Sequence, residues 1–294
     1  MIEISTFEDK INRTIQAFSL IKPDDQIGIA LSGDDSYAIM IYLAKNALSR
    51  NIVAITIQES MQTSRNDEVK ICSELASKLG IPHIVVNFHA IYGKDLEDIL
   101  AIAGKIDSNI SPCALCIGLR QDALIKAADE IGVTVLVDGY NAEDWSLNII
   151  RKFLFGDTPS PCPNLIPELV MAVKRQEGSV KCVSPLSFVR KKEAQEYADA
   201  YYPANFPDYS CSYQAFLGTQ DLGKVISLLD QLEPDLILGL VGRELQPTGT
   251  RIPCSRCGQS PCPNNKVDLC RACWLSEQLG LSINLGGLKQ WKFY

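Results

Sequence analysis

The sequence predicts an α/β protein in which a parallel β-sheet carries helices on both faces and a small zinc module follows at the C-terminus. Two observations predict the sheet: short segments that are apolar almost throughout, and segments of helical periodicity that separate them. A third observation, a cysteine-rich stretch that begins near Pro253, predicts the zinc module. We therefore divide the 294 residues into an α/β domain over 1–215, a helical connection over 216–252, and a zinc-binding module and tail over 253–294.

Apolar strands and amphipathic helices are expected to alternate along the α/β domain. The expected strands cover Gln26–Leu31, Asn51–Ile57, His83–Phe88, Val133–Tyr140 and Lys181–Leu186. The expected helices cover Tyr37–Leu48, Asp67–Leu79, Ser111–Ile131, 141–156 and Lys191–Tyr201, with a further one at Ala215–Leu232. The helix that starts at Ser111 has the clearest signals, because Pro112 suits the first helical position and Gly132 suits the end.

The net charge of −7 argues against a surface that is coated by nucleic acid throughout, but it leaves room for a local basic patch. Basic residues gather between Arg151 and Lys192, and again near the C-terminus. Lys152, Arg190 and Lys191 are the candidates for contact with a phosphate backbone. Ordinary solvated faces are the alternative explanation of these clusters.

No segment of the sequence is long and apolar enough to span a bilayer, and the start MIEISTFEDK lacks the order of a signal peptide. The cytoplasm is therefore the expected location, without membrane contact. Disulfides are rare there, so the 11 cysteines indicate metal binding or redox chemistry. Cys72 is expected in the core, and the pattern assigns no role to Cys162 or Cys182.

A turn of sequence SGDDS, residues 32–36, links the first expected strand to a helix. Such a turn presents free N–H groups to an anion, and ligands of parallel sheets bind beyond the carboxyl ends of the strands. Gly33 would let the backbone approach a phosphate, and a cation such as Mg²⁺ would have to separate the phosphate from Asp34 and Asp35. From these residues alone, a capped turn without a ligand is the simpler explanation.

Cys113 and Cys116 lie near the start of an expected helix, three residues apart and hence on one face. The helix dipole there favours the thiolate, which is the form that ligates metals and attacks sulfur. The spacing leaves a redox pair, half of a zinc site and an iron–sulfur site open. Two small buried side chains are the remaining alternative.

The segment CSRCGQSPCPNNKVDLCRACW, residues 254–274, has the cysteine spacing of a tetrahedral Zn²⁺ site. The expected ligands are Cys254, Cys257, Cys270 and Cys273, and Cys262 is a spare that could replace one of them. Metal binding would supply the folding energy of a module this short. The arginines and lysines around it leave a nucleic-acid contact open as a second role.

The segment ALSGDDSYAIM resembles the pyrophosphate loop of the ATP pyrophosphatases, the PP-loop family, whose usual form is S-G-G-x-D-S. Ser32, Gly33, Asp35 and Ser36 match that form, whereas one residue of the G-x portion and the lysine frequent there are absent. The resemblance implies an adenine-nucleotide α-hydrolase-like fold. It also implies ATP at this loop and at Gly139, Mg²⁺ at Asp35, and Ile57 facing the adenine.

A longer stretch, SPCALCIGLRQDALIKAADEIGVTVLVDGYNAEDW, resembles the tRNA 2-thiolation branch of that family. Gly139, Asn141 and Asp144 match the G-H-N-x-D-D motif of the branch, while Tyr140 replaces its histidine and Glu143 its first aspartate. The segment SPLSFVRKKEAQEYA resembles the next strand and helix, so the resemblance covers roughly residues 20–215.

In that branch a third cysteine joins the pair to hold a [4Fe–4S] cluster, and Cys211 in YSCSYQ sits at the matching place. The resemblance therefore implies a cluster on Cys113, Cys116 and Cys211, with one iron open to exogenous sulfide. Enzymes of the branch also carry a similar C-terminal zinc module.

The resemblance as a whole implies a tRNA-thiolating enzyme with ATP, Mg²⁺, zinc and a [4Fe–4S] cluster. A pyrimidine carbonyl oxygen would be adenylated and then replaced by sulfur, with Asp35, Asp144 and the three cysteines as catalytic residues. tRNA and a sulfur-donor protein or sulfide are the expected partners, and a homodimer is left open. One alternative is a degenerate PP-loop protein that does not hydrolyse ATP and instead carries sulfur or senses redox state. Another is an enzyme of the same fold that adenylates a different substrate.

Overall fold

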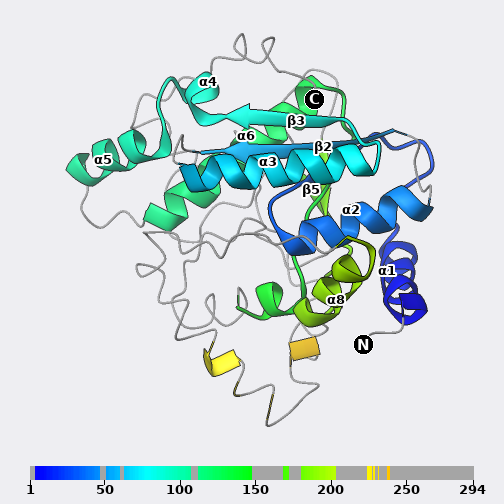
Figure 1. Ribbon diagram of the computed structural model, residues 1–294. Helices are drawn as coiled ribbons and strands as arrows, with labels where there is room; N and C mark the ends of the chain where they lie inside the picture. Colours follow the sequence, from blue (N-terminus) through cyan, green and yellow to red (C-terminus); the bar gives the residue numbers. More distant parts are fainter. Residues whose placement is uncertain are drawn as a thin grey trace.

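The computed structural model describes residues 4–46, 51–59, 63–106, 112–147, 168–171 and 180–202, together with a few residues between 224 and 238. These residues form a β-sheet with helices packed against it (Figure 1). The residues outside the described part include Cys162, Cys211, Cys254, Cys257, Cys262, Cys270, Cys273 and Lys152. The zinc module and the domain boundaries at 215 and 252 therefore stay predictions.

The sheet has six strands among the described residues, in the order β3-β2-β1-β4-β6-β5. The strands are β1 Ile27–Ala30, β2 Ile52–Gln58, β3 His83–Asn87, β4 Val135–Val137, β5 Glu168–Met171 and β6 Val180–Val183. All the strands predicted from the sequence are present and run parallel, as their continuous apolar character indicates. β5 is an addition: this short edge strand pairs antiparallel with β6, so the sheet is mixed.

The helices are α1 Ile4–Phe18, α2 Asp34–Asn46, α3 Thr63–Lys78, α4 Phe88–Tyr92, α5 Leu96–Ile106, α6 Pro112–Glu130 and α8 Lys191–Tyr201, and residues 142–147 are also helical. Helices α1, α4 and α5 add to the predicted set. Helix α2 begins at Asp34 rather than at Tyr37, so both aspartates of the SGDDS segment belong to its first turn. The remainder of the helix expected over 141–156 lies outside the described residues.

Helices cover both faces of the sheet, as the sequence predicts (Figure 1). One apolar cluster packs α4, α5 and α6 against one face, and a second packs α1, α2, α3 and α8 against the other. Alternate residues of β4 serve the two clusters, because successive side chains of a strand point to opposite faces: Leu136 joins the first, and Val135 and Val137 join the second. Cys72 is fully buried in the second cluster, which confirms its predicted place in the core.

The parallel strands bring their carboxyl ends to one edge of the sheet. The chain leaves β1 toward β2 on one side, whereas β4 lies on the other side of β1. Such a change of direction opens a crevice where ligands of open α/β sheets bind. The segments that follow β1 and β4 are therefore where a site is expected. No helix in the described part of the chain is long and apolar enough to cross a membrane.

Candidate active site

A cavity of about 290 Å³ opens at the carboxyl ends of β1 and β4. It is lined by Ala30, Ser32, Asp35, Ser36, Ile117, Arg120, Gln121, Leu124, Leu136, Asp138, Gly139, Tyr140, Asp144 and Cys182. The lining joins the SGDDS segment, the segment after β4 and helix α6, which carries the two cysteines. Three parts of the sequence with candidate chemistry thus meet at one cavity.

The SGDDS segment forms a compact turn at the start of α2. The Ser36 hydroxyl donates to the carbonyl oxygen of Gly33 at 2.9 Å and accepts from the Ser32 N–H at 2.8 Å. The Tyr37 N–H also donates to the Gly33 carbonyl oxygen, at 3.1 Å. Gly33 has a φ of +101°, which L side chains rarely adopt, so the turn needs glycine here for its backbone conformation. The Ser36 side chain therefore holds the turn closed.

Gly139, after β4, packs directly on this turn. A Cβ at Gly139 would lie 2.5 Å from the Ser36 backbone nitrogen and 2.8 Å from the Ser36 Cα. Those distances are shorter than any van der Waals contact, so only glycine lets the two backbones come this close. The contact fixes the segment after β4 against the first turn of α2.

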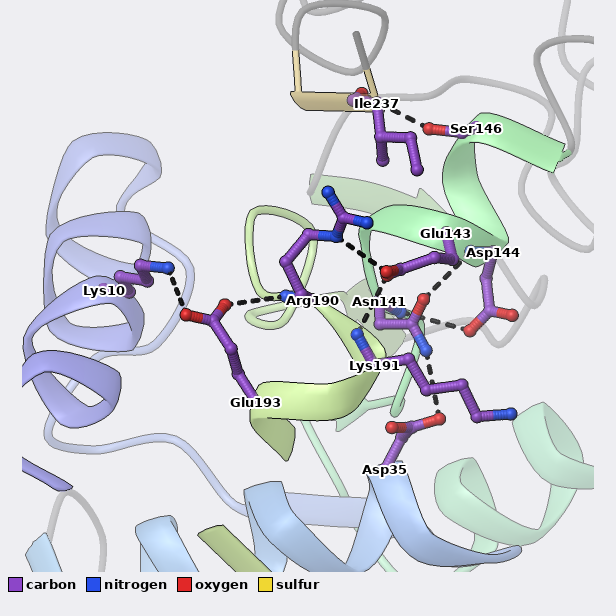
Figure 2. A network of polar contacts seen from close by, with 10 residues as sticks. All are labelled: Lys10, Asp35, Asn141, Glu143, Asp144, Ser146, Arg190, Lys191, Glu193 and Ile237. Carbon is purple, nitrogen blue, oxygen red and sulfur yellow. Dashed lines mark hydrogen bonds and ion pairs between the residues drawn. The ribbon is translucent and has the colours of Figure 1, made fainter. Parts of the chain in front are cut away.

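Asn141 joins the same two segments through its side chain (Figure 2). Its amide Nδ2 donates to Asp35 Oδ2 at 3.0 Å, and its Oδ1 accepts from the Asp144 N–H at 2.9 Å. The Asn141 N–H donates in turn to Asp144 Oδ2 at 3.2 Å. Asn141 is fully buried, and a buried amide with its hydrogen bonds satisfied specifies one arrangement of its partners. The structure therefore brings together Asp35 and Asp144, two residues that the sequence assigns to the site.

Asp138 is a third carboxyl group in the cavity lining and one that sequence reasoning misses. Burial raises its pKa to about 7, although Ser184 and the Tyr140 N–H, which donates to Asp138 Oδ1 at 3.1 Å, favour the charged form. Burial also raises the pKa of Asp144 to about 6, against the stabilising effect of the Asn141 N–H and of Lys191. These carboxyl groups can therefore exchange protons near neutral pH. The signal that could have found Asp138 is its place directly after a buried strand.

Arg120 of α6 brings a positive charge to the cavity. Its Nη1 lies 2.7 Å from Oε1 of Glu59, a residue just after β2 that is only 1% exposed. Burial lowers the pKa of the guanidinium, but Glu59 together with Cys116, Glu68 and Tyr140 more than offsets this, and the pKa is raised. The guanidinium is therefore charged at neutral pH. Arg120 lies in the segment that resembles the 2-thiolation branch, where it had no predicted role, and no pattern in the sequence pointed to Glu59.

Comparison with known families decides the relationship of this chain, because the model of the PP-loop domain family matches residues 4–216. The chain belongs to the PP-loop family. The resemblance seen in the SGDDS segment is thereby confirmed, and the cavity lies at the PP-loop.

Relatives with assigned names point to one branch of the PP-loop family. The cytoplasmic tRNA 2-thiolation protein 1 of Caenorhabditis elegans is 26% identical over 288 residues, covering 93% of this chain and 73% of that protein. The tRNA 2-thiolation protein NcsA of Haloferax volcanii is 27% identical over 271 residues, covering 85% of this chain and 81% of that protein. The resemblance to the 2-thiolation branch is confirmed by these similarities.

A solved structure supports the fold. The U34-tRNA thiolase NcsA from Methanococcus maripaludis, with its [4Fe–4S] cluster, is similar with a TM-score of 0.72. The two chains share 19% sequence identity, and the match covers 94% of this chain and 89% of that one. The PP-loop α/β architecture predicted from the sequence is therefore confirmed over the described residues.

The two cysteines of the predicted cluster site are the second and fifth residues of α6. Cys116 is partly exposed, and Arg120 lies one turn further along the same helix. The side chain of Cys113 and the whole of Cys211 lie outside the described residues, so the structure does not test whether the three sulfur atoms meet. Within the described part of the chain, no group of three His, Cys, Asp or Glu side chains could hold a metal ion.

Two further cavity residues differ in what they offer to a ligand. Cys182 is buried below the PP-loop cavity, and burial raises the pKa of its thiol, so it is a neutral part of the wall. Tyr140 lies at the cavity with its ring centroid 5.6 Å from that of Trp145, tilted by 47°.

Ile57, which was expected to face the adenine, is 5% exposed within the apolar cluster beside α6 and is not among the residues that line the cavity. The structure thus brings Gly139 to the PP-loop but does not bring Ile57 to the cavity.

Glu143, which replaces an aspartate of the branch motif, holds the start of α8 (Figure 2). Its Oε1 accepts from Arg190 Nε at 2.7 Å, and its Oε2 accepts from the Lys191 N–H at 2.9 Å. Arg190 is therefore engaged within the chain, which weakens its candidacy for nucleic-acid contact. The Lys191 side chain is exposed and runs toward Asp35 and Asp144.

Proposed function

We propose that this chain is an ATP-dependent tRNA thiolase, which activates a carbonyl oxygen of a tRNA pyrimidine and replaces that oxygen with sulfur. One observation carries the proposal: Asn141 ties Asp35 of the PP-loop to Asp144 of the second motif, beside the helix with the cysteines. The names of the relatives supply the substrate class, since they are 2-thiolation proteins of tRNA.

The PP-loop and its neighbours would bind the nucleotide. The backbone N–H groups at the start of α2 would receive the phosphates of ATP, since a helix N-terminus favours anions. Asp35 would hold Mg²⁺ through its carboxylate, with Asn141 fixing the orientation of that carboxylate. The carbonyl oxygen of the base would attack the α-phosphorus, forming the O–P bond as the bond to pyrophosphate breaks.

The second step removes the activated oxygen. A sulfide would attack the carbon of the base, and AMP would leave with the former carbonyl oxygen. Asp138 and Asp144 have pKa values raised by burial to about 7 and about 6, which suits them to accept or return protons as the base rearranges. Arg120 would stabilise negative charge that develops on this side of the cavity.

The donor set at the start of α6 fits a cluster. Cys116 is partly exposed at a helix N-terminus, one turn from the cationic Arg120, and both features favour the thiolate. Cys113, Cys116 and Cys211 would hold a [4Fe–4S] cluster, which would present the sulfur that enters the base. We retain zinc at Cys254, Cys257, Cys270 and Cys273 as part of the proposal, on the spacing of those cysteines. A cytoplasmic location accords with the names of the relatives.

The proposal is tested by replacing one expected cluster ligand. Cys113→Ala is expected to abolish both the visible absorbance of the anaerobically reconstituted protein and the formation of thionucleoside in bulk tRNA. Cys162→Ala, at a cysteine to which the sequence assigns no role, is the matched control and should leave both signals in place. Thiolation that persists in the Cys113→Ala protein would falsify the assignment.

The short PP-loop favours one second candidate, a sulfur carrier or redox sensor that does not hydrolyse ATP. The loop lacks one residue and the lysine of the usual motif, and the Ser36 hydroxyl is already engaged within the turn. Calorimetric titration with ATP and Mg²⁺ separates the two functions. Heat of binding supports the thiolase, and its absence together with an intact cluster supports the carrier.

A further inference from the structure

Among the described residues, the phosphate side of the cavity is short of positive charge. The PP-loop of this chain carries two aspartates and no lysine. Asp138 and Asp144 also line the cavity, and the Arg120 guanidinium on the α6 side is paired with Glu59 at 2.7 Å. A nucleoside triphosphate brings several negative charges to the PP-loop, so its binding calls for a cationic side chain from another segment.

Lys191 is held at the right place to supply that charge. It is the first residue of α8, the helix that packs against α2, and α2 begins within the PP-loop. Glu143 fixes its backbone by accepting the Lys191 N–H at 2.9 Å and holds the preceding residue through the Arg190 side chain at 2.7 Å. The side chain runs from this anchored start toward Asp35 and Asp144 (Figure 2).

The ammonium group of Lys191 remains available for a ligand. Over the described residues it forms neither a hydrogen bond nor an ion pair, and the Lys191 side chain is exposed. The charge nevertheless acts on the site, because Lys191 favours the ionised form of Asp144 and opposes the rise of its pKa. The next residue differs in this respect: Lys192 is 87% exposed and lies 4.0 Å from Glu196 on its own helix.

We propose that Lys191 binds the phosphates of the nucleotide, supplying from α8 the positive charge that the shortened PP-loop lacks. This inference rests on the proposed binding of ATP at the loop. It assigns Lys191 to the nucleotide rather than to the phosphate backbone of tRNA, because its side chain lies among Asp35, Asn141 and Asp144 in Figure 2. An anchored backbone with a long, exposed side chain suits a group that must reach a ligand.

The test compares neighbouring lysines in the full chain. Calorimetry with ATP, AMP and adenosine in the presence of Mg²⁺ is carried out on the unmodified protein, Lys191→Ala, Lys191→Arg and Lys192→Ala. Lys191→Ala is expected to weaken ATP binding by about tenfold or more, as the loss of one charge-assisted hydrogen bond predicts. Adenosine binding should stay unchanged, Lys191→Arg should bind ATP nearly as well as the unmodified protein, and Lys192→Ala should match that protein.

Two results would overturn the inference, and they are distinguishable. Equal ATP affinity of Lys191→Ala and the unmodified protein would remove Lys191 from the phosphate site while leaving the proposed function intact. A parallel loss of tRNA affinity in that variant, with a smaller salt dependence, would then assign the residue to tRNA. Failure of the unmodified protein to bind ATP would overturn the inference together with the ATP-dependent function.

Discussion

The two sides of the cavity are held together by different means. On the PP-loop side, the backbone at Gly139 touches the backbone at Ser36, and the neutral amide of Asn141 links the Asp35 carboxylate to the Asp144 N–H. On the α6 side, one ion pair between Arg120 and the buried Glu59 joins a helix to the end of β2. The first side is fixed by shape and the second by charge, so they should respond differently to substitution.

The ion pair should give the largest effect. Arg120→Met leaves the Glu59 carboxylate buried without its counter-charge, and we expect a loss of about 3 kcal/mol in the free energy of unfolding. The double variant Glu59→Gln with Arg120→Met should recover most of that loss, because it removes both charges. Lys126→Met, which breaks the i,i+4 pair with Asp122 on the same helix, is the control and should cost less than about 1 kcal/mol. Denaturant unfolding measures the stability of all these variants. Equal losses for Arg120→Met and Lys126→Met would contradict a special role for the buried ion pair.

Breaking the contact between Gly139 and Ser36 should give the second-largest loss of stability. Gly139→Ala places a methyl group 2.5 Å from the Ser36 nitrogen, so the two segments must separate. We expect a loss of about 2 kcal/mol in stability, within the usual cost of overpacking, and a loss of ATP binding of about tenfold or more. Gly104→Ala in α5 is the matched control, because a Cβ there meets nothing within 4 Å. It should be neutral or slightly stabilising, since alanine favours a helix. Normal ATP affinity in Gly139→Ala would show that the contact is not needed for the site.

The last effect concerns the dependence of stability on pH. Asp138 has a folded-state pKa of about 7, above the unfolded value of 3.8, so the folded protein keeps the Asp138 proton up to a higher pH than the unfolded chain does. The stability from this group is full below about pH 4 and is lost as the pH rises through about 7. Asp138→Asn should flatten this decline, with a gain in stability at pH 8, where the buried carboxyl would be ionised, and little change at pH 4. Thermal unfolding across this range measures the slope, and parallel curves for the two proteins would refute the prediction.

Sequence reasoning succeeded where the signal is local. The apolar strands and the SGDDS turn could be placed because strand burial and turn chemistry are read from neighbouring residues. It failed at Asp138 because the expected strand ran on to Tyr140, which hid the residue that follows the true end of β4 at Val137. It also failed at Glu59, whose importance arises only from its contact with α6.

The residues of the family motif show the same difference between local signals and long-range contacts. Gly139, Asn141 and Asp144 were identified by their resemblance to a family motif, which implied a nucleotide contact for Gly139 and a catalytic role for Asp144 but gave Asn141 no role. Only the fold shows that Gly139 serves as a contact surface for the PP-loop and that Asn141 binds Asp35. Ile57 packs in the apolar cluster beside α6, and its expected contact with the adenine stays a prediction.

By itself the sequence determined the parallel strands, helices α2, α3, α6 and α8, the phosphate turn and the pair of cysteines at the start of α6, since each depends on residues close along the chain. The tertiary structure decided which of these segments meet. The placement of β4 beside β1 brings Asn141 to Asp35 across more than a hundred residues, and the packing of α8 on α2 aims Lys191 at the same place. Contacts of this range follow from strand order and helix packing, which no local pattern encodes.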